Sequence, residues 1–362
     1  MGARILGIET SCDETAIGIV ADGREVLSNA VASSLDLHAP YGGVIPEIAA
    51  RMHVETMWAV LSTALSQARL SPEEIDAIAV TQGPGLPGAL LIGLAFAKGL
   101  ALCLDRPLVP VDHLAAHLYA GEMTDAQMAP PYVGLVVSGG HTLLCVVHSD
   151  CRFELLGETK DDAVGEAFDK VAKILGLGYP GGPVIDRLSS EAANRAIPFP
   201  RGTTKQPFDF SFSGLKTAVF HYVEKQVQGS RVKVQGENLE PRTSNLEPQE
   251  VADIAASFQE AAVDVLIAKT LKACKRTGLT RVVIGGGVAS NRRLRARFDE
   301  EGAAHKLHVV FPPPALCVDN GAMVAGIGFP LLQRGRVAPL TLNSDSNLRL
   351  QELESPVEAR SA

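Results

Sequence analysis

Apolar runs alternate with polar tips along the chain, and one arrangement of them occurs twice. Near the N-terminus the run RILGIE (residues 4–9) is followed by the polar tip TSCDET, the run AIGIVA and a turn at Asp22–Gly23. From Tyr132 the same order returns as YVGLVV, the tip SGGHT, LLCVVH and RFELLG. Apolar segments of strand length joined by short polar turns predict β-hairpins. The repeat therefore predicts two similar units, each beginning with a hairpin.

Each unit continues with a strand, a glycine-rich loop and a helix. These segments read DAIAVTQGPGLPGALLIGLAFAKGLAL (residues 76–102) and RVVIGGGVASNRRLRARF (residues 281–298). A strand that passes through glycines into a helix forms a junction where backbone amides can reach a ligand. We expect an α/β fold of two halves, residues 1–130 and 131–336, whose polar tips face a common cleft. The helix after Asp319 is expected to pack back towards the first half.

Three further stretches have the apolar spacing of helices, at residues 47–68, 163–175 and 249–276. Residues 226–249 are polar and contain NLEP twice, which predicts an exposed, mobile insertion. Residues 337–362 are expected to form a C-terminal tail that frays after about residue 350.

Composition narrows the class of protein. The 362 residues, 46% of them hydrophobic, suit two domains with their own cores. Abundant glycine (34 residues) and scarce aromatics (5%) favour an α/β protein with glycine-rich ligand loops over a β-sandwich. A net charge of −8 argues against a freestanding nucleic-acid binder. An RNA substrate would therefore need a local basic patch or a partner protein.

Cysteine usage and hydropathy indicate the compartment. None of the six cysteines forms a C-x-x-C pair, which predicts a reducing, cytoplasmic environment. The most apolar run, Gly88–Leu104, is interrupted by Lys98 and contains several glycines. It is shorter and more mixed than a membrane span, so we expect a buried helix and no membrane partner.

Two histidines and an aspartate are candidate metal ligands. His113 and His117 are four residues apart in PVDHLAAH, so on a helix their side chains share one face. Asp319 in CVDNGAM could complete a site of two imidazoles and one carboxylate. The alternative readings are core histidines and an aspartate that caps a helix. A zinc protease of the H-E-x-x-H type is disfavoured because Leu114, Ala115 and Ala116 separate the histidines.

The glycine-rich tips are candidate nucleotide-binding loops. Residues 136–142 (VVSGGHT) and 285–291 (GGGVASN) lack the G-K-[ST] of a Walker A loop, but their amides could approach a phosphate. The alternative is a tight turn in each case. Asp169 could accept ribose hydroxyls, or it could pair with Lys173 on a helix surface.

Many of these segments together resemble one family. The quoted motifs are GIETSCDET, HAPYGGVIPEIAAR, TQGPGLPGALLIG, HLAAH, LVVSGGHT, DDAVGEAFDK, YPGGP, FDFSFSGLKT, GGGVASN and CVDNGAM. In this order, from about Arg4 to Leu332, they resemble the bacterial TsaD family of tRNA threonylcarbamoyladenosine transferases, once labelled glycoproteases. The resemblance implies the actin, sugar-kinase and chaperone-ATPase superfamily, with two ribonuclease-H-like halves. It also implies transfer of threonylcarbamoyl from threonylcarbamoyl-AMP to the exocyclic amine of the adenosine beside the anticodon (position 37), releasing AMP.

The family's site residues can be carried onto this sequence one by one. The metal ligands map onto His113, His117 and Asp319. Iron is the first expectation for the divalent ion, with zinc or manganese as alternatives that the same donors would accept. The ligand-contacting residues map onto Val136, Val137, Ser138, Gly139, Gly140, Asp169, Gly182, Asp186 and Asn291. Asp13, at the first polar tip, is the candidate general base for a weakly nucleophilic amine, although it could equally order the loop.

The resemblance also implies partners besides tRNA. They are a TsaB-like paralogue that pairs through helices and a TsaE-like P-loop ATPase, and the helix at 47–68 is a candidate pairing surface. Two basic groups could meet RNA, although such runs are commonly solvated: Arg292, Arg293, Arg295 and Arg297, and Arg201, Lys205 and Lys216. Asp112 stands where many bacterial members carry a histidine. The competing hypotheses are a kinase or ATPase of the same superfamily, and a non-catalytic scaffold.

Overall fold

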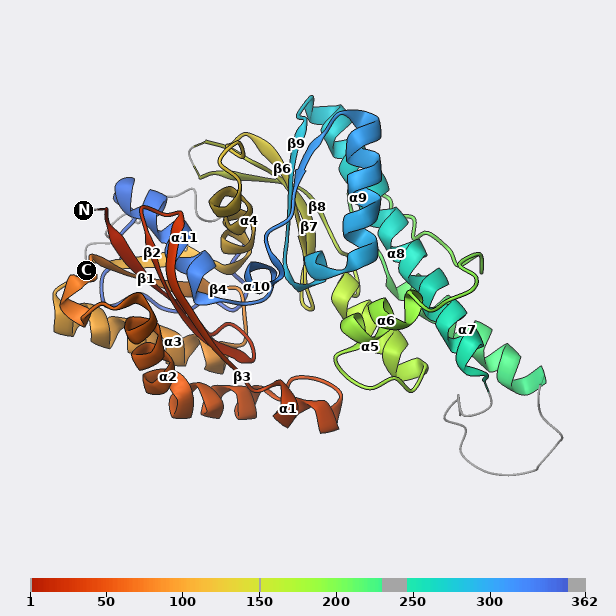
Figure 1. Cartoon of the computed structure of the whole chain (residues 1–362), viewed down its shortest axis with the longest axis horizontal. Coiled ribbons are helices and arrows are strands. Elements are labelled where there is room, and N and C mark those ends of the chain that lie inside the picture. Colours follow the sequence, from red (N-terminus) through yellow and green to blue (C-terminus); the bar gives the residue numbers. More distant parts are fainter. Residues whose placement is uncertain (1, 150, 230–245, 351–362) are drawn as a thin grey trace.

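The computed structural model describes residues 2–149, 151–229 and 246–350, and its first half is built on a five-stranded sheet (Figure 1). The strand order is β3-β2-β1-β4-β5. The hairpins pair β1 (Arg4–Glu9) with β2 (Glu14–Ala21) and β2 with β3 (Glu25–Ser33), both antiparallel. β4 (Ala77–Gly83) and β5 (Leu108–Asp112) extend the other edge in parallel.

The second sheet has the order β10-β9-β6-β7-β8, which, read from its other edge, is the first order with each number raised by five. β6 (Tyr132–Val137), β7 (Thr142–Val147) and β8 (Phe153–Glu158) form the antiparallel part. β9 (Arg281–Gly285) and β10 (His308–Val310) add parallel strands. The duplication expected from the sequence is therefore confirmed strand by strand.

Helices cover the outer face of each sheet. α2 (Pro46–Ala68) and α3 (Pro87–Leu104) pack on the first sheet. The second sheet shares a core with α5 (Val164–Ile174), α7 (Ser213–Gly229) and α8 (Pro248–Thr277), while α6 (Gly181–Ser189) packs on α5 and α8. The helices predicted at 47–68, 163–175 and 249–276 are α2, α5 and α8, within a residue or so at each end.

The inner faces are covered by an exchange of helices. α4 (His113–Thr124) ends the first half but packs against β6 and β9 of the second sheet. α11 (Gly321–Gln333) ends the second half but packs against β1 and β2 of the first. A Cβ atom on Gly18 or Gly321 would collide with the backbone of the other element, so both glycines permit the close approach of α11 to β2. α4 and α11 also pack on each other, and one apolar core joins both halves.

The remaining described elements are the helix α9 (Arg292–His305) and five short ones: α1 (Leu35–His38), η1 (Ala39–Tyr41), η2 (Pro72–Glu74), η4 (Gly287–Ser290) and α10 (Pro314–Cys317). Residues 230–245 of the predicted insertion and 351–362 of the predicted tail lie outside the described residues. The insertion was predicted too wide, because Gln226 belongs to α7 and Gln249 belongs to α8. The boundaries at 130 and 336 remain predictions.

α3 differs from the buried helix that its composition suggests. By length and apolarity it could cross a membrane, a criterion that core helices of globular proteins also meet. One face is buried against β4 and α2, through residues such as Leu90, Leu94 and Ala97. On the other face Leu91 and Leu102 are 59% and 68% exposed. The helix is therefore half-covered in the isolated chain.

Candidate metal and nucleotide site

The three predicted metal ligands come together where the exchanged helices meet. Asp112 caps the N-terminus of α4, its Oδ1 accepting hydrogen bonds from the amides of Leu114 (2.7 Å) and Ala115 (2.9 Å). The first turn that follows places the rings of His113 and His117 4.6 Å apart between centroids. Asp319, just before α11, brings Oδ1 to 3.1 Å from Nε2 of His117 and 3.6 Å from Nε2 of His113.

These donors suit a single cation. One ligand atom from each of the three residues lies within 4.8 Å of the others, so the group could bind a metal. His117 is fully buried, yet within the described chain neither ring nitrogen forms a hydrogen bond of acceptable geometry. Buried polar atoms are normally satisfied, so an unsatisfied Nε2 facing a carboxylate fits coordination of a metal ion.

Glu9 orients His113. Its side chain is fully buried at the end of β1, and Oε2 lies 3.0 Å from Nδ1 of His113 and accepts a 2.6 Å hydrogen bond from Thr81 Oγ1. Oε1 accepts from the amide of Ser11 (2.6 Å). A carboxylate on Nδ1 fixes the tautomer and leaves Nε2 for a metal. Glu9 was not among the predicted site residues, although an acidic residue that ends an otherwise apolar strand was a signal for it.

The pKa values show how strongly the cluster attracts positive charge. Burial works to lower the pKa of His113, but Glu9 and Asp319 raise it to about 10. Burial works to raise the pKa of Asp319, but His113 and His117 lower it to about 2. The fully buried carboxylate of Glu9 and the partly buried carboxylate of Asp319 therefore place negative charge on both sides of His113. A divalent cation held by His113, His117 and Asp319 would neutralise that charge.

The first predicted phosphate loop lies beside this cluster. Ser138, Gly139 and Gly140 form the turn between β6 and β7, closed by a 2.8 Å hydrogen bond from the amide of Ser138 to the carbonyl of His141. Gly139 and Gly140 are exposed, and among the described residues their amides donate no hydrogen bond. Burial lowers the pKa of His141 to about 4, and the charges of His113 and His117 contribute. His141, which was not predicted as a site residue, therefore lies within electrostatic range of the predicted metal ligands.

Val136 and Val137 precede this turn at the end of β6. Both side chains are fully buried in the two apolar cores, on opposite faces of the sheet. Any contact that these two residues make with a ligand must therefore come from the backbone.

The acidic residues predicted to meet ribose are already engaged within the chain. Asp169, on α5, accepts a 2.7 Å hydrogen bond from the amide of Gly181, at the start of α6, and burial raises its pKa. Asp186, on α6, accepts a 2.7 Å hydrogen bond from Nε of Arg292. Gly182 has open space around its Cα. A ribose would have to share or replace these contacts.

Asn291 is an N-cap residue in the described structure. Its Oδ1 accepts from the amide of Leu294 (2.9 Å) and its Nδ2 donates to Oε1 of Gln259 (2.7 Å). The amide therefore positions α9, which begins directly after the second glycine-rich loop.

Asp13 lies in the first half, on the turn between β1 and β2. Its carbonyl accepts hydrogen bonds from the amide and the hydroxyl of Ser34 (3.1 and 2.8 Å). Burial, with the charges of Asp319 and Asp13, raises the pKa of Glu14 to about 9. Burial and the charges of Asp169 and Asp13 raise the pKa of Tyr179. Tyr179 therefore lies within electrostatic reach of acidic residues in both halves, a position that the sequence did not reveal.

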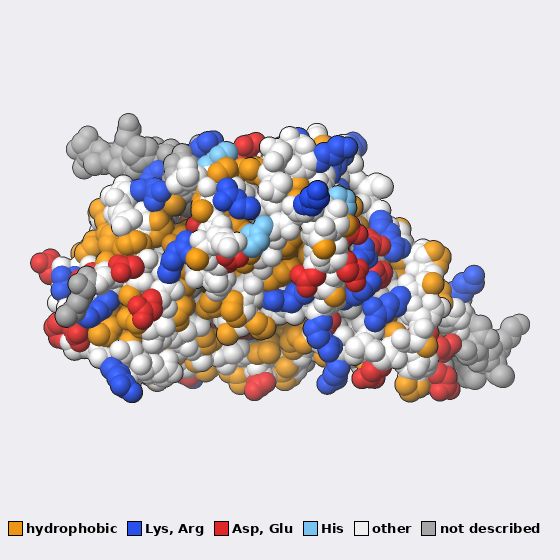
Figure 2. All heavy atoms as spheres, turned by 45° about the horizontal axis from the view of Figure 1, so that its top comes forward, with side chains coloured by type: hydrophobic (Ala, Val, Ile, Leu, Met, Phe, Trp, Pro, Cys, Tyr) orange, Lys and Arg blue, Asp and Glu red, His pale blue; other side chains and the backbone are white. Residues whose placement is uncertain are grey.

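The basic groups considered for RNA are largely paired with acids. Arg293 and Arg297 bind Glu260, and Arg297 also binds Asp264 (2.9 Å). Arg201 binds Asp264 (2.7 Å) and Lys216 binds Asp162 (3.0 Å). On the face drawn in Figure 2, Lys and Arg side chains are interspersed with Asp and Glu. The arginines of α9 are therefore mainly structural, and they do not form a free basic patch.

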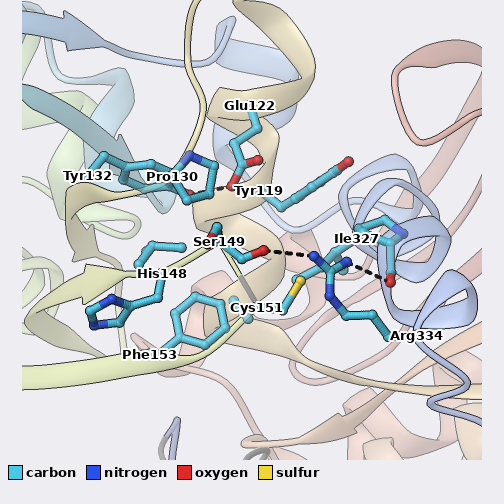
Figure 3. A pocket seen from close by; sticks show the side chains of 13 residues that line it. Tyr119, Glu122, Pro130, Tyr132, His148, Ser149, Cys151, Phe153, Ile327 and Arg334 are labelled. Carbon is cyan, nitrogen blue, oxygen red and sulfur yellow. Dashed lines mark hydrogen bonds between the residues drawn. The ribbon is translucent and has the colours of Figure 1, made fainter.

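A separate cavity of about 190 Å³ lies at the far ends of α4 and α11 (Figure 3). Tyr119, Glu122, Phe153 and Arg334 are among the residues that line it. Arg334 donates a 2.7 Å hydrogen bond to the carbonyl of Ser149 across its mouth. None of the predicted site residues lines this cavity, so it is not the candidate site.

Comparison with known proteins decides the family. The model of the family "TsaD: tRNA N6-adenosine threonylcarbamoyltransferase" matches residues 25–326. The chain belongs to this family. A Clostridium novyi tRNA N6-adenosine threonylcarbamoyltransferase is 47% identical over 353 residues, covering 96% of this chain and 98% of the relative. The enzyme of the same name from Syntrophotalea carbinolica is 48% identical over 360 residues, covering 98% and 99%.

Solved structures show the fold shared beyond the TsaD family. Full-length HypF in its phosphate- and nucleotide-bound form has a TM-score of 0.58 at 16% identity, over 93% of this chain and 56% of HypF. Component A of the (R)-2-hydroxyglutaryl-CoA dehydratase of Acidaminococcus fermentans has a TM-score of 0.52 at 15% identity, over 90% and 96%. The predicted α/β fold with two similar halves is confirmed by the two five-stranded sheets, and these solved structures share that fold.

Proposed function

We propose that this chain transfers the threonylcarbamoyl group from threonylcarbamoyl-AMP to the exocyclic amine of adenosine 37 in tRNAs that read codons beginning with A, releasing AMP. The observation that carries the proposal is the cluster of His113, His117 and Asp319 beside an exposed glycine turn, in a member of a tRNA-modifying transferase family. An ATPase or kinase has no evident use for this ligand set.

His113, His117 and Asp319 would hold one divalent ion, iron first, with zinc or manganese as alternatives. When bound, such an ion supplies a Lewis acid for an oxygen of the acyl or phosphate group. The chain's own part begins with Glu9, which holds His113 in the tautomer that presents Nε2. The exposed amides of Gly139 and Gly140 would donate to anionic oxygens of the adenylate.

The two walls of the cleft would then position the reactants. Asp13 on the first wall would accept the proton that leaves the adenosine amine. On the second wall, Ser138, Asp169, Gly182, Asp186 and Asn291 would hold the nucleotide, with Val136 and Val137 contributing backbone groups. An exocyclic amine is a weak nucleophile because its lone pair is delocalised, so alignment of the two substrates supplies much of the rate.

The proposed setting is the cytoplasm, with a TsaB-like paralogue and a TsaE-like P-loop ATPase as partners. The outer face of α2 and α3 supports a pairing role. Val54 and Trp58 are 58% and 67% exposed, and Trp58 stacks edge-on against Phe96 of α3 at 5.1 Å. Exposed apolar patches of this kind commonly mark protein interfaces.

The test is nucleoside mass spectrometry of tRNA after reaction with the chain, its partner proteins and threonylcarbamoyl-AMP. We expect wild type to form threonylcarbamoyladenosine and His113→Ala to form at least about tenfold less, which is about 1.4 kcal/mol of transition-state stabilisation. His221→Ala, at an exposed histidine on α7, is the matched control. Consumption of ATP without modified tRNA, with all partners present, would replace the transferase with a kinase or ATPase.

A further inference from the structure

Arg295 connects the second glycine-rich loop to the segment that carries Asp319. It lies one turn into α9, and its Nε donates a 2.7 Å hydrogen bond to the carbonyl of Ala289, within η4. Its second terminal nitrogen donates to the carbonyl of Pro312 (2.7 Å) and to Sγ of Cys317 (3.3 Å). The guanidinium also lies 4.8 Å from the ring centroid of Phe311. One side chain therefore contacts the loop before Asn291 and both ends of the segment before Asp319.

Arg295 differs from its neighbours on α9 in its choice of partners. Arg292, Arg293 and Arg297 bind carboxylates of Asp186, Glu260 and Asp264. The partners of Arg295 are instead backbone carbonyls and a thiol. A planar guanidinium can donate in two directions at fixed angles, which suits it to hold two backbone segments at a set spacing.

The contacts of Arg295 act on the position of Asp319. Cys317, which the guanidinium contacts, is two residues before the aspartate, and its Sγ also donates to the carbonyl of Pro312 (3.2 Å). On the other side Asn320 caps α11 and donates to the carbonyl of Val318 (2.8 Å). Asp319 therefore stands between two anchored residues, one held from α9 and one from α11.

We infer that Arg295 is a positioning residue that sets the metal ligand Asp319 against the loop at residues 286–291. The inference rests on the proposed function, which gives the metal and the nucleotide their roles. The contacts by which Arg295 holds the two segments together do not depend on that reaction. Glu9 would orient the metal ligand His113 from the first half, and Arg295 would position the metal ligand Asp319 from the second half. Substrate need not touch Arg295.

The inference is tested with Arg295→Met and Arg295→Lys in the full-length chain, with Arg293→Met as the control. Arg293 lies on the same helix and its loss removes the same charge, but its partners are the carboxylates of Glu260 and Glu300. Amide hydrogen exchange is followed by mass spectrometry for peptides covering residues 286–291 and 311–320, and Co²⁺ affinity is followed by absorption titration.

We expect Arg295→Met to speed exchange in both segments and to weaken Co²⁺ binding by about tenfold or more, the range found for residues that orient metal ligands. Arg295→Lys should give exchange rates and a Co²⁺ affinity between those of wild type and Arg295→Met, because an ammonium can reach one carbonyl but lacks the planar fork of a guanidinium. Arg293→Met should match wild type in both readouts, even if its melting temperature drops.

Unchanged exchange at 311–320 in Arg295→Met, or equal effects from Arg293→Met, would overturn the inference. α10 also touches η4 directly, and that contact alone would then suffice to hold the two segments. A wild-type chain that shows these differences but does not modify tRNA would overturn the proposed function and leave the positioning role supported. If the wild-type chain does not bind Co²⁺, the hydrogen-exchange result alone decides whether Arg295 has the inferred positioning role.

Discussion

At the scale of single residues, the ligand set is held by side chains that do not belong to it. Glu9 accepts from Thr81 and the amide of Ser11 while it faces His113. A ligand whose other nitrogen is fixed in this way loses less conformational freedom when it binds a metal. The orientation of His113 is therefore built into the end of β1, far from α4 in the sequence.

Replacing Glu9 with Gln should weaken divalent-metal binding by about 10- to 100-fold, or about 1.4–2.7 kcal/mol. The amide keeps the shape but removes the charge that draws a cation and favours the Nδ1–H tautomer. Co²⁺ titration of the purified chain measures the change.

Glu74→Gln, at a surface residue paired with Arg4, is the matched control for Glu9→Gln and should leave Co²⁺ affinity unchanged. Thermal unfolding, measured alongside, separates loss of the site from loss of the fold. Equal Co²⁺ affinity in wild type and Glu9→Gln would contradict the role of Glu9.

At the scale of elements, the approach of α11 to the first sheet depends on residues without side chains. Gly7 and Gly18 on the sheet face Gly321, Ala322 and Ala325 on the helix. Helix and strand backbones come closer here than any larger residue would allow. Because Asp319 lies two residues before α11, this close packing also fixes how deeply the carboxylate enters the cleft.

Gly18→Ala should destabilise the chain by about 1–3 kcal/mol, because the added methyl must push α11 away from β2. Gly99→Ala, within the length of α3, is the control, because a Cβ atom at Gly99 would meet no neighbouring atom within 4 Å. That control should be neutral or stabilising by up to about 1 kcal/mol. Denaturant unfolding measures both, and equal stability of the two variants would refute the packing argument.

At the scale of the whole molecule, the sequence predicted the two halves, the ligand set and a helix after Asp319 that packs back towards the first half, but it did not predict that α4 packs on the second sheet. The repeat of apolar runs was sufficient for two sheets, because strand pairing within a hairpin is local. Which sheet a helix covers depends on tertiary packing, and the apolar residues of α4 would suit either sheet. Glu9 was not predicted, because its side-chain partners Thr81 and His113 lie more than 70 residues away. Arg295 was considered only as an RNA contact, because its partners lie up to 22 residues away.

The outer face of α2 and α3 leads to a prediction about assembly. If the proposed TsaB-like paralogue pairs through this face, Trp58→Asp should weaken its binding by at least about tenfold, as loss of a large aromatic anchor commonly does. Thr280→Asp adds the same charge at an exposed position on the second half and should leave binding unchanged. Calorimetric titration measures both affinities. Unaltered affinity in Trp58→Asp would show that the interface does not include Trp58.

The exchange of α4 and α11 has a consequence for the origin of the chain. The inner face of each sheet packs mainly against the last helix of the other half, although α4 also touches β4 and β5 of its own half. A single ancestral unit with this topology would have been complete only as a two-fold dimer in which identical helices changed places. The present chain has the architecture of such a helix-swapped dimer joined into one polypeptide. Once joined, the two copies could diverge in sequence, so that one supplies the imidazoles and the other the carboxylate.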